Sequence, residues 1–212
     1  MTKYPIFLEL SGRRVVVIGG GGVAVRKVQT LMSTGARIIV VAERIDDMMT
    51  AMCAGTDVEL VKGSYSKSYL ASAVLAIAAT NNSDLNKKIY KDCQELDILC
   101  NVVDVPELCD FYVPAVVKRG KLQIAIETDG GSPAYAGHIR KKLEKVFTEK
   151  HGEFVAELET LRKRVIDEIA DATDRKAVFG ELVNDESFDY FDEKGPAAWR
   201  GRAEKIILEH KS

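Results

Sequence analysis

The sequence predicts an α/β fold in which the N-terminal half forms a parallel sheet. Over residues 1–113, short runs rich in valine and isoleucine alternate with stretches of helical character. Such alternation with short links indicates right-handed βαβ units, and therefore parallel strands. The first run, Arg14–Ile18, is almost entirely apolar and lies between glycines, which is typical of a strand buried on both faces.

The elements of this half follow in order along the chain. We predict strands over residues 14–18, 37–41, 57–61, 75–79 and 98–103, and helices over residues 23–34 and 84–96. Gly35 comes directly after the first helix, and glycine is a common residue just past a helix end.

The pattern changes after residue 113, where strands become rare. One more strand is predicted at Leu122–Ile126, and Ser132 is placed to cap a helix that begins at Pro133 and runs to about Lys150. Beyond it we predict an amphipathic helix over residues 154–169, short helices over 174–184 and 196–209, and an acidic, aromatic loop over 185–193.

Composition and charge exclude several classes of protein. The 212 residues carry 30 Lys and Arg against 32 Asp and Glu, a balance that argues against a dedicated nucleic-acid binder. No apolar run approaches the roughly 20 residues that span a bilayer, and the N-terminus lacks the apolar core of a secretory signal. We therefore expect a cytoplasmic protein with no membrane partner.

The cysteines and histidines do not predict a metal site. The four cysteines form no CxxC pair and have no histidine at metal-ligand spacing, so we expect reduced and mostly buried thiols: Cys53, Cys93, Cys100 and Cys109.

A glycine-rich loop follows the first strand. Gly19, Gly21 and Ala24 match the pattern G-x-G-x-x-A, in which glycines permit a tight turn and a close approach of the backbone to a pyrophosphate. Gly22 and Val23 open the next helix, whose N-terminus supplies partial positive charge. The strand-loop-helix context is the one that the motif requires. The alternative is a structural glycine turn without a ligand.

Two further positions extend the predicted cofactor site. Glu43 lies 24 residues after Gly19 at the end of the second strand, where a carboxylate can bind ribose hydroxyls and would repel the 2′-phosphate of NADP. We therefore expect NAD, although Arg44 could accommodate that phosphate. Thr80 and Asn81 end the fourth strand on the carboxyl edge of the sheet, close to the expected nicotinamide, and an ordinary polar turn is an equal alternative there.

Taken together, these residues resemble a known family. The order of five segments is that of precorrin-2 dehydrogenases, which are stand-alone proteins or the N-terminal part of siroheme synthase: Gly19–Lys27, Ala79–Thr80, Asn101–Asp104, Phe111–Ala115 and Ser132–Pro133. The resemblance is densest over residues 4–145. It implies NAD-dependent oxidation of precorrin-2 to sirohydrochlorin by a homodimer, with Fe(II) insertion in some members.

The resemblance also implies an organisation in three parts. Residues 1–113 would form a Rossmann-like NAD-binding domain, residues 114–150 a small dimerisation and substrate segment, and residues 151–212 a helical C-terminal domain.

Asp104 is the candidate acid/base group. The resemblance gives it this role, and its position just past the fifth strand places it on the same sheet edge as the glycine loop. Partial burial beside the substrate is expected to raise its pKa. The alternative is a capping box, because Glu107 follows three residues later.

The middle segment is basic. Residues 114–150 hold eight basic and four acidic side chains, and the tetrapyrrole substrate that the resemblance implies is a polycarboxylate. We expect four basic residues to attract it by steering or direct pairing: Lys118, Arg119, Lys121 and Arg140. The resemblance also places Thr128 and Ser132 near the substrate, although acidic residues at 127 and 129 depart from the family pattern.

Two rival functions remain at this point. A non-catalytic NAD-sensing module would need the glycine loop and Glu43 but not Asp104. A protein that acts mainly as a chelatase would take sirohydrochlorin and Fe(II), and His138 could then assist the metal, although an exposed helical histidine is the simpler interpretation.

Overall fold

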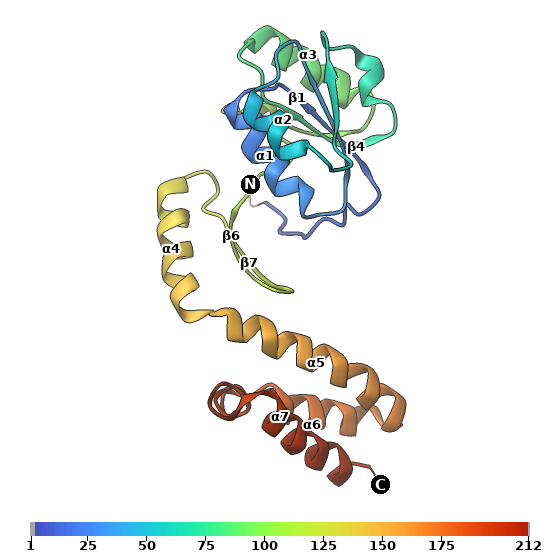
Figure 1. Cartoon of the computed structure of the whole chain (residues 1–212), viewed down its shortest axis with the longest axis vertical. Coiled ribbons are helices and arrows are strands. Elements are labelled where there is room, and N and C mark those ends of the chain that lie inside the picture. The colour runs from blue at the N-terminus through green and yellow to red at the C-terminus, as the bar shows by residue number, and fades with distance from the viewer. Residues whose placement is uncertain (1–2, 212) are drawn as a thin grey trace. The chain divides into compact units, whose positions relative to one another are not determined.

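A computed structural model describes residues 3–211, and the chain divides into two compact units after Val113. The first unit contains a five-stranded parallel sheet (Figure 1). In spatial order its strands are β3 (Glu59–Lys62), β2 (Arg37–Ala42), β1 (Arg14–Ile18), β4 (Ala73–Ala78) and β5 (Leu99–Val102). The predicted α/β class and parallel sheet are thus confirmed. The strand order reverses direction between β1 and β4, which is the place where open α/β sheets bind ligands.

Helices cover both faces of this sheet. The helices are α1 (Gly22–Met32), α2 (Asp47–Cys53) and α3 (Ser83–Gln94), with short 3₁₀ turns η1 (Lys67–Leu70) and η2 (Pro106–Leu108). Val15 and Val17 pack with α1 and α2 on one face, and Val16 and Ile18 pack with α3 on the other. Because β1 is buried on both faces, its continuous apolar run is explained.

The second unit begins with a hairpin and continues as helices. Its elements are β6 (Ala115–Arg119), β7 (Leu122–Ile126), α4 (Pro133–Val146), α5 (Glu149–Glu168), α6 (Ala172–Leu182) and α7 (Asp185–Glu209). The last three helices share an apolar core around Trp199 and Phe191, neither of which is exposed. The helix α7 is interrupted at Gly195, where φ is 80°, directly before Pro196.

Several predicted elements were incomplete or wrong. The helix α2 and the strand β6 were not predicted, and the helix after Pro133 ends at Val146 rather than near Lys150. The loop predicted over residues 185–193 is the first part of α7. It is helical because the Asn184 side chain caps it and Phe191 anchors it in the core.

None of the helices within residues 3–211 combines the length and the apolarity needed to cross a membrane. All four cysteines are free thiols, and three of them are buried.

Candidate functional site

A cavity of about 710 Å³ lies at the carboxyl ends of the central strands of the first unit. Its lining comes mainly from three places in the chain: residues 18–23, residues 41–46 and residues 79–82. The cavity therefore brings together the glycine loop, Glu43, Arg44, Thr80 and Asn81, and cofactor binding by these residues stays a prediction. A second cavity of similar volume lies at the amino ends of the strands, beside Arg14 and Arg37, but no glycine-rich loop faces it.

The four consecutive glycines divide into two pairs. A Cβ on Gly19 would meet the Ala79 carbonyl oxygen at 2.3 Å, and one on Gly20 would meet the Arg44 carbonyl oxygen at 2.2 Å. A Cβ on Gly21 or Gly22 would meet nothing within 4 Å. The first pair thus allows close packing within the protein, and the second pair leaves open space on the cavity side.

The helix α1 starts at this open space. The N-cap residue before it, Gly21, provides no side-chain cap, so the first backbone N–H groups of the helix are available to an acceptor. Ala24 is fully buried against the sheet, where a larger side chain would separate helix from strand. An anionic diphosphate fits a helix N-terminus with open space around it.

Glu43 is held by a residue that sequence reasoning missed. The Ser64 hydroxyl donates to Glu43 Oε1 over 2.8 Å, and the Gly63 N–H donates to the Ala42 carbonyl over 3.0 Å, which keeps the two strand ends together. The second carboxylate oxygen of Glu43 faces no such donor among the described residues. Arg44 also lines the cavity. Glu43 and Arg44, the two residues that could select between NAD and NADP, therefore lie at the same site.

Tyr65 forms part of the cavity wall and was also missed. Its hydroxyl donates to Asp92 Oδ2 over 2.9 Å. Burial and this hydrogen bond raise the pKa of Tyr65, so its phenol stays uncharged where it lines the cavity. No local pattern identified it, because Asp92 lies 27 residues farther along the chain.

Thr80 mainly supports the turn into α3. Its hydroxyl lies 2.6 Å from Asn86 Oδ1, and the Asn86 amide donates back to the Thr80 carbonyl over 3.0 Å. Asn82 caps α3 by accepting two backbone N–H groups. The Thr80 proton is thus engaged within the protein, whereas Asn81 is exposed at the cavity.

Asp104 lies in a turn just past β5, and the capping alternative for it was wrong. Its side chain is exposed, and its partial burial beside a substrate stays a prediction. The residue is not a helix cap, because the cap position of η2 is Val105 and no side chain bonds there. Asp104 instead has a φ of 60°, a left-handed conformation that is uncommon outside glycine.

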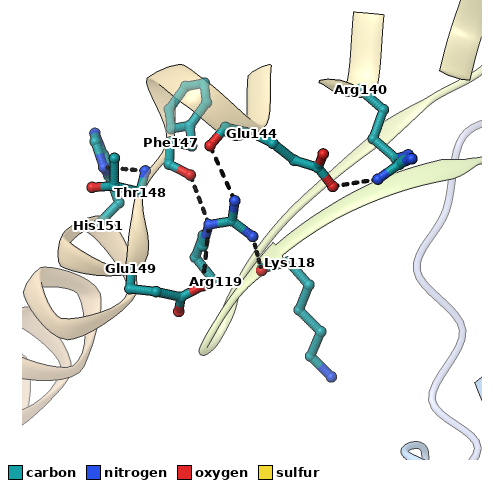
Figure 2. A network of polar contacts seen from close by, with 8 residues as sticks. All are labelled: Lys118, Arg119, Arg140, Glu144, Phe147, Thr148, Glu149 and His151. Atoms are coloured by element: carbon teal, nitrogen blue, oxygen red, sulfur yellow. Dashed lines mark hydrogen bonds and ion pairs between the residues drawn. The ribbon is translucent and has the colours of Figure 1, made fainter. Parts of the chain in front are cut away.

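In the second unit, Arg119 occupies the centre of a polar network (Figure 2). Its guanidinium donates to the carbonyls of Phe147 (2.7 Å), Glu144 (3.1 Å) and Lys118 (2.9 Å), and pairs with Glu149 at 3.3 Å. It therefore ties β6 to the end of α4 and the start of α5. Lys118 is exposed, and Figure 2 shows its side chain extending away from this network.

The other predicted substrate residues also have partners within the chain. Arg140 pairs with Glu144, the Thr128 hydroxyl accepts the Ser132 N–H at 3.1 Å, and the Ser132 hydroxyl accepts the Tyr135 N–H at 3.3 Å as the predicted cap of α4. Substrate contact by Lys118, Arg119, Lys121, Arg140, Thr128 or Ser132 stays a prediction.

The doubly wound sheet and the glycine loop define a dinucleotide-binding α/β protein. The chain belongs to the family described as "Putative NAD(P)-binding", whose model matches residues 6–115. A second family, "Sirohaem biosynthesis protein central", matches residues 119–145.

Curated relatives and a solved structure agree with this assignment. The chain is 38% identical over 152 residues to the siroheme synthase of Psychrobacter arcticus, which covers 72% of this chain and 28% of that protein. It is 33% identical over 207 residues to the siroheme synthase of Thioalkalivibrio sulfidiphilus, covering 98% of this chain and 42% of that one. The chain thus spans less than half the length of these relatives.

The structure entitled "SirC, precorrin-2 dehydrogenase" has the same fold. It matches with a TM-score of 0.79 and 24% identity, covering 96% of this chain and all of the other. The family resemblance inferred from the sequence motifs is therefore confirmed.

Proposed function

We propose that the protein is an NAD-dependent dehydrogenase that converts precorrin-2 to sirohydrochlorin. One observation carries the proposal: the NAD(P) cavity and Asp104 lie at the carboxyl edge of the same sheet, on neighbouring strands β4 and β5. The Val103 N–H donates to the Ala78 carbonyl over 3.0 Å, which joins the two strand ends directly. The siroheme synthase relatives support the choice of substrate.

When bound, NAD⁺ would supply the hydride acceptor for this reaction, and the protein would have to accept a proton. The open space at Gly21 and Gly22 and the N-terminus of α1 would hold the diphosphate. Asp104 would take the proton, since its carboxylate is exposed and has no hydrogen bond to another described residue. A positioned general base contributes about 10²–10⁴ in rate.

We further propose that NAD is preferred over NADP. Ser64 holds one carboxylate oxygen of Glu43 and leaves the other for a ribose hydroxyl, where a 2′-phosphate would be repelled. The ratio of kcat/KM for the two cofactors tests this preference. A clear preference for NADP would assign the phosphate to Arg44 and contradict the role of Glu43.

The remaining parts of the proposal concern substrate and assembly. Among the predicted basic residues, Lys118 is exposed and the least engaged within the chain (Figure 2), so we favour it for attracting the substrate carboxylates. The family resemblance supports a cytoplasmic homodimer.

The deciding experiment supplies the purified protein with precorrin-2 and NAD⁺ and follows the absorbance of NADH. Formation of NADH together with sirohydrochlorin is the expected result. Cofactor binding without NADH formation would indicate the NAD-sensing module instead. A second assay with sirohydrochlorin and Fe(II) asks whether the protein also inserts metal.

A further inference from the structure

The side chain of Asp104 does not stabilise the turn in which this residue lies. Within residues 3–211 its carboxylate has no hydrogen bond or ion pair, and its backbone is in the left-handed region with φ 60°. A turn of this kind persists only where its surroundings hold it. The direction of the carboxylate therefore depends on whatever fixes the backbone on either side.

The thiol of Cys109 provides such a contact. Its Sγ lies 3.2 Å from the Val102 carbonyl oxygen and 3.3 Å from the Val105 carbonyl oxygen, one on each side of Asp104. A thiol is a weak donor with a single proton, so the two carbonyls share it. The Val105 N–H also donates to the Val102 carbonyl over 3.3 Å, which closes the turn.

Asn101 holds the thiol in place. Its side-chain amide donates to Cys109 Sγ over 3.3 Å and to the Phe111 carbonyl over 2.9 Å. Asn101 is only 7% exposed, and it faces Cys109 in an isolated antiparallel bridge. The amide, the thiol and the two carbonyls thus form a closed clip around the Asp104 turn.

The same corner lies near the helix that begins at the glycine loop. Lys27 of α1 is half-buried, and burial lowers its pKa, whereas the negative charge of Asp104 acts in the opposite direction. Lys27 and Asp104 are therefore within electrostatic reach of each other.

We propose that Cys109 is a positioning residue for the dehydrogenation, which holds the Asp104 turn through the Val102 and Val105 carbonyls. This inference rests on the proposed function. Misplacement of a reacting group by about 1 Å can cost on the order of 10²-fold in rate. Loss of the thiol is therefore expected to lower kcat while cofactor affinity is unchanged.

The test compares Cys109→Ala with two other changes in the full chain. Cys109→Ser keeps a donor and an acceptor, and Cys53→Ala removes another buried thiol from α2, away from the turn. We expect Cys109→Ala to lower kcat by about tenfold or more, Cys109→Ser to recover much of this loss, and Cys53→Ala to retain the wild-type kcat. The KM for NAD⁺ is expected to stay within a fewfold of wild type.

Amide hydrogen exchange at Val105 gives a readout that is independent of activity. Faster exchange there in Cys109→Ala, with an unchanged rate in Cys53→Ala, is expected if the thiol closes the turn. Unchanged exchange, or equal kcat in the two alanine variants, would overturn the inference. If Cys109→Ala does not fold, Cys109→Val removes the donor with less loss of volume and takes its place.

Failure of the proposed function has a different signature. In that case wild type and Cys53→Ala would both form no NADH, while exchange at Val105 would still report on the clip.

Discussion

The two units of the chain are stabilised in different ways. In the sheet unit, apolar side chains cover both faces of β1 and its neighbours, so polar side chains at the strand ends are available for turns and ligands. In the second unit, the last three helices also share an apolar core, but charged side chains connect the elements in addition. Arg119 joins β6 to α4 and α5, and Arg164 joins α5 to α7. A basic residue in this unit is thus as much a structural link as a ligand-binding group.

Neighbouring residues of β6 show the distinction most directly. Val117 is buried, and side chains alternate along a strand, so Arg119 lies on the same face as Val117 and reaches the helices. Lys118 lies on the other face and is exposed. The net positive charge of this segment therefore overstates the number of basic side chains that are available to bind a substrate.

The largest effect is expected in the sheet unit from Asp104→Asn. If Asp104 is the base, kcat falls by about 10²–10⁴-fold, whereas NAD⁺ binding and the melting temperature stay close to wild type. Asp97 provides a matched control, because it is another exposed aspartate with positive φ, 52°. Wild-type kcat in Asp104→Asn, or an equal loss in Asp97→Asn, would remove Asp104 from the mechanism.

The second prediction concerns the core of the helical unit. Trp199 is fully buried, and its indole N–H donates to the Ser187 hydroxyl over 2.8 Å. Trp199→Ala is expected to reduce the free energy of unfolding by about 3–5 kcal/mol. Circular dichroism would show early loss of helix on heating, and calorimetric titration would show an unchanged Kd for NAD⁺. A large change in that Kd would mean that the two units are energetically coupled.

The third prediction separates Arg119 from Lys118. Arg119→Met leaves the carbonyls of Glu144 and Phe147 without their donor, and we expect a loss of about 1–3 kcal/mol in stability. Lys118→Met should leave stability unchanged and raise the KM for precorrin-2 more than it lowers kcat. Thermal melts and steady-state kinetics on both variants check this, and the reverse pattern would refute the division of roles.

The smallest effect concerns acid and salt. Hydrogen bonds from Arg164 lower the pKa of Glu204 and Glu168 below their usual 4.5. A carboxyl whose pKa is lower in the folded state contributes stability above its unfolded pKa, and this contribution is lost as the pH falls through the folded pKa. The helical unit is thus expected to lose some stability below about pH 4.5.

Arg164→Gln is the control for this acid effect. It should flatten the dependence of the melting temperature on pH over that range, and salt should weaken the wild-type effect because the pairs are partly exposed. A pH dependence identical to wild type would exclude these pairs as its source.

The sequence predicted the sheet well because its signals are local. Each strand is a short run of β-branched residues, and the glycine loop follows one of them at the expected spacing. Two elements were missed although signals were present. Asp46 caps α2 by accepting the Met48 N–H, and the Gly120–Lys121 turn between β6 and β7 is typical of a hairpin.

The remaining errors involve contacts between distant parts of the sequence. The predicted loop over residues 185–193 is helical because Phe191 packs with Phe154 and Trp199, and no local pattern reports such packing. The engagement of Arg119 with carbonyls 25 and 28 residues away is equally hidden. Ser64, which lies 21 residues from Glu43, was missed for the same reason.

The division of the four glycines has a consequence for natural and laboratory variation at this loop. An added methyl group at Gly19 or Gly20 collides with backbone atoms, whereas one at Gly21 or Gly22 enters open space. Substitutions at the first pair should therefore lower the amount of folded protein in the cell. Substitutions at the second pair should leave the protein folded but weaken its binding of the cofactor. Inherited substitutions within this one loop can thus lower activity for two different physical reasons, which a screen that measures activity alone would not distinguish.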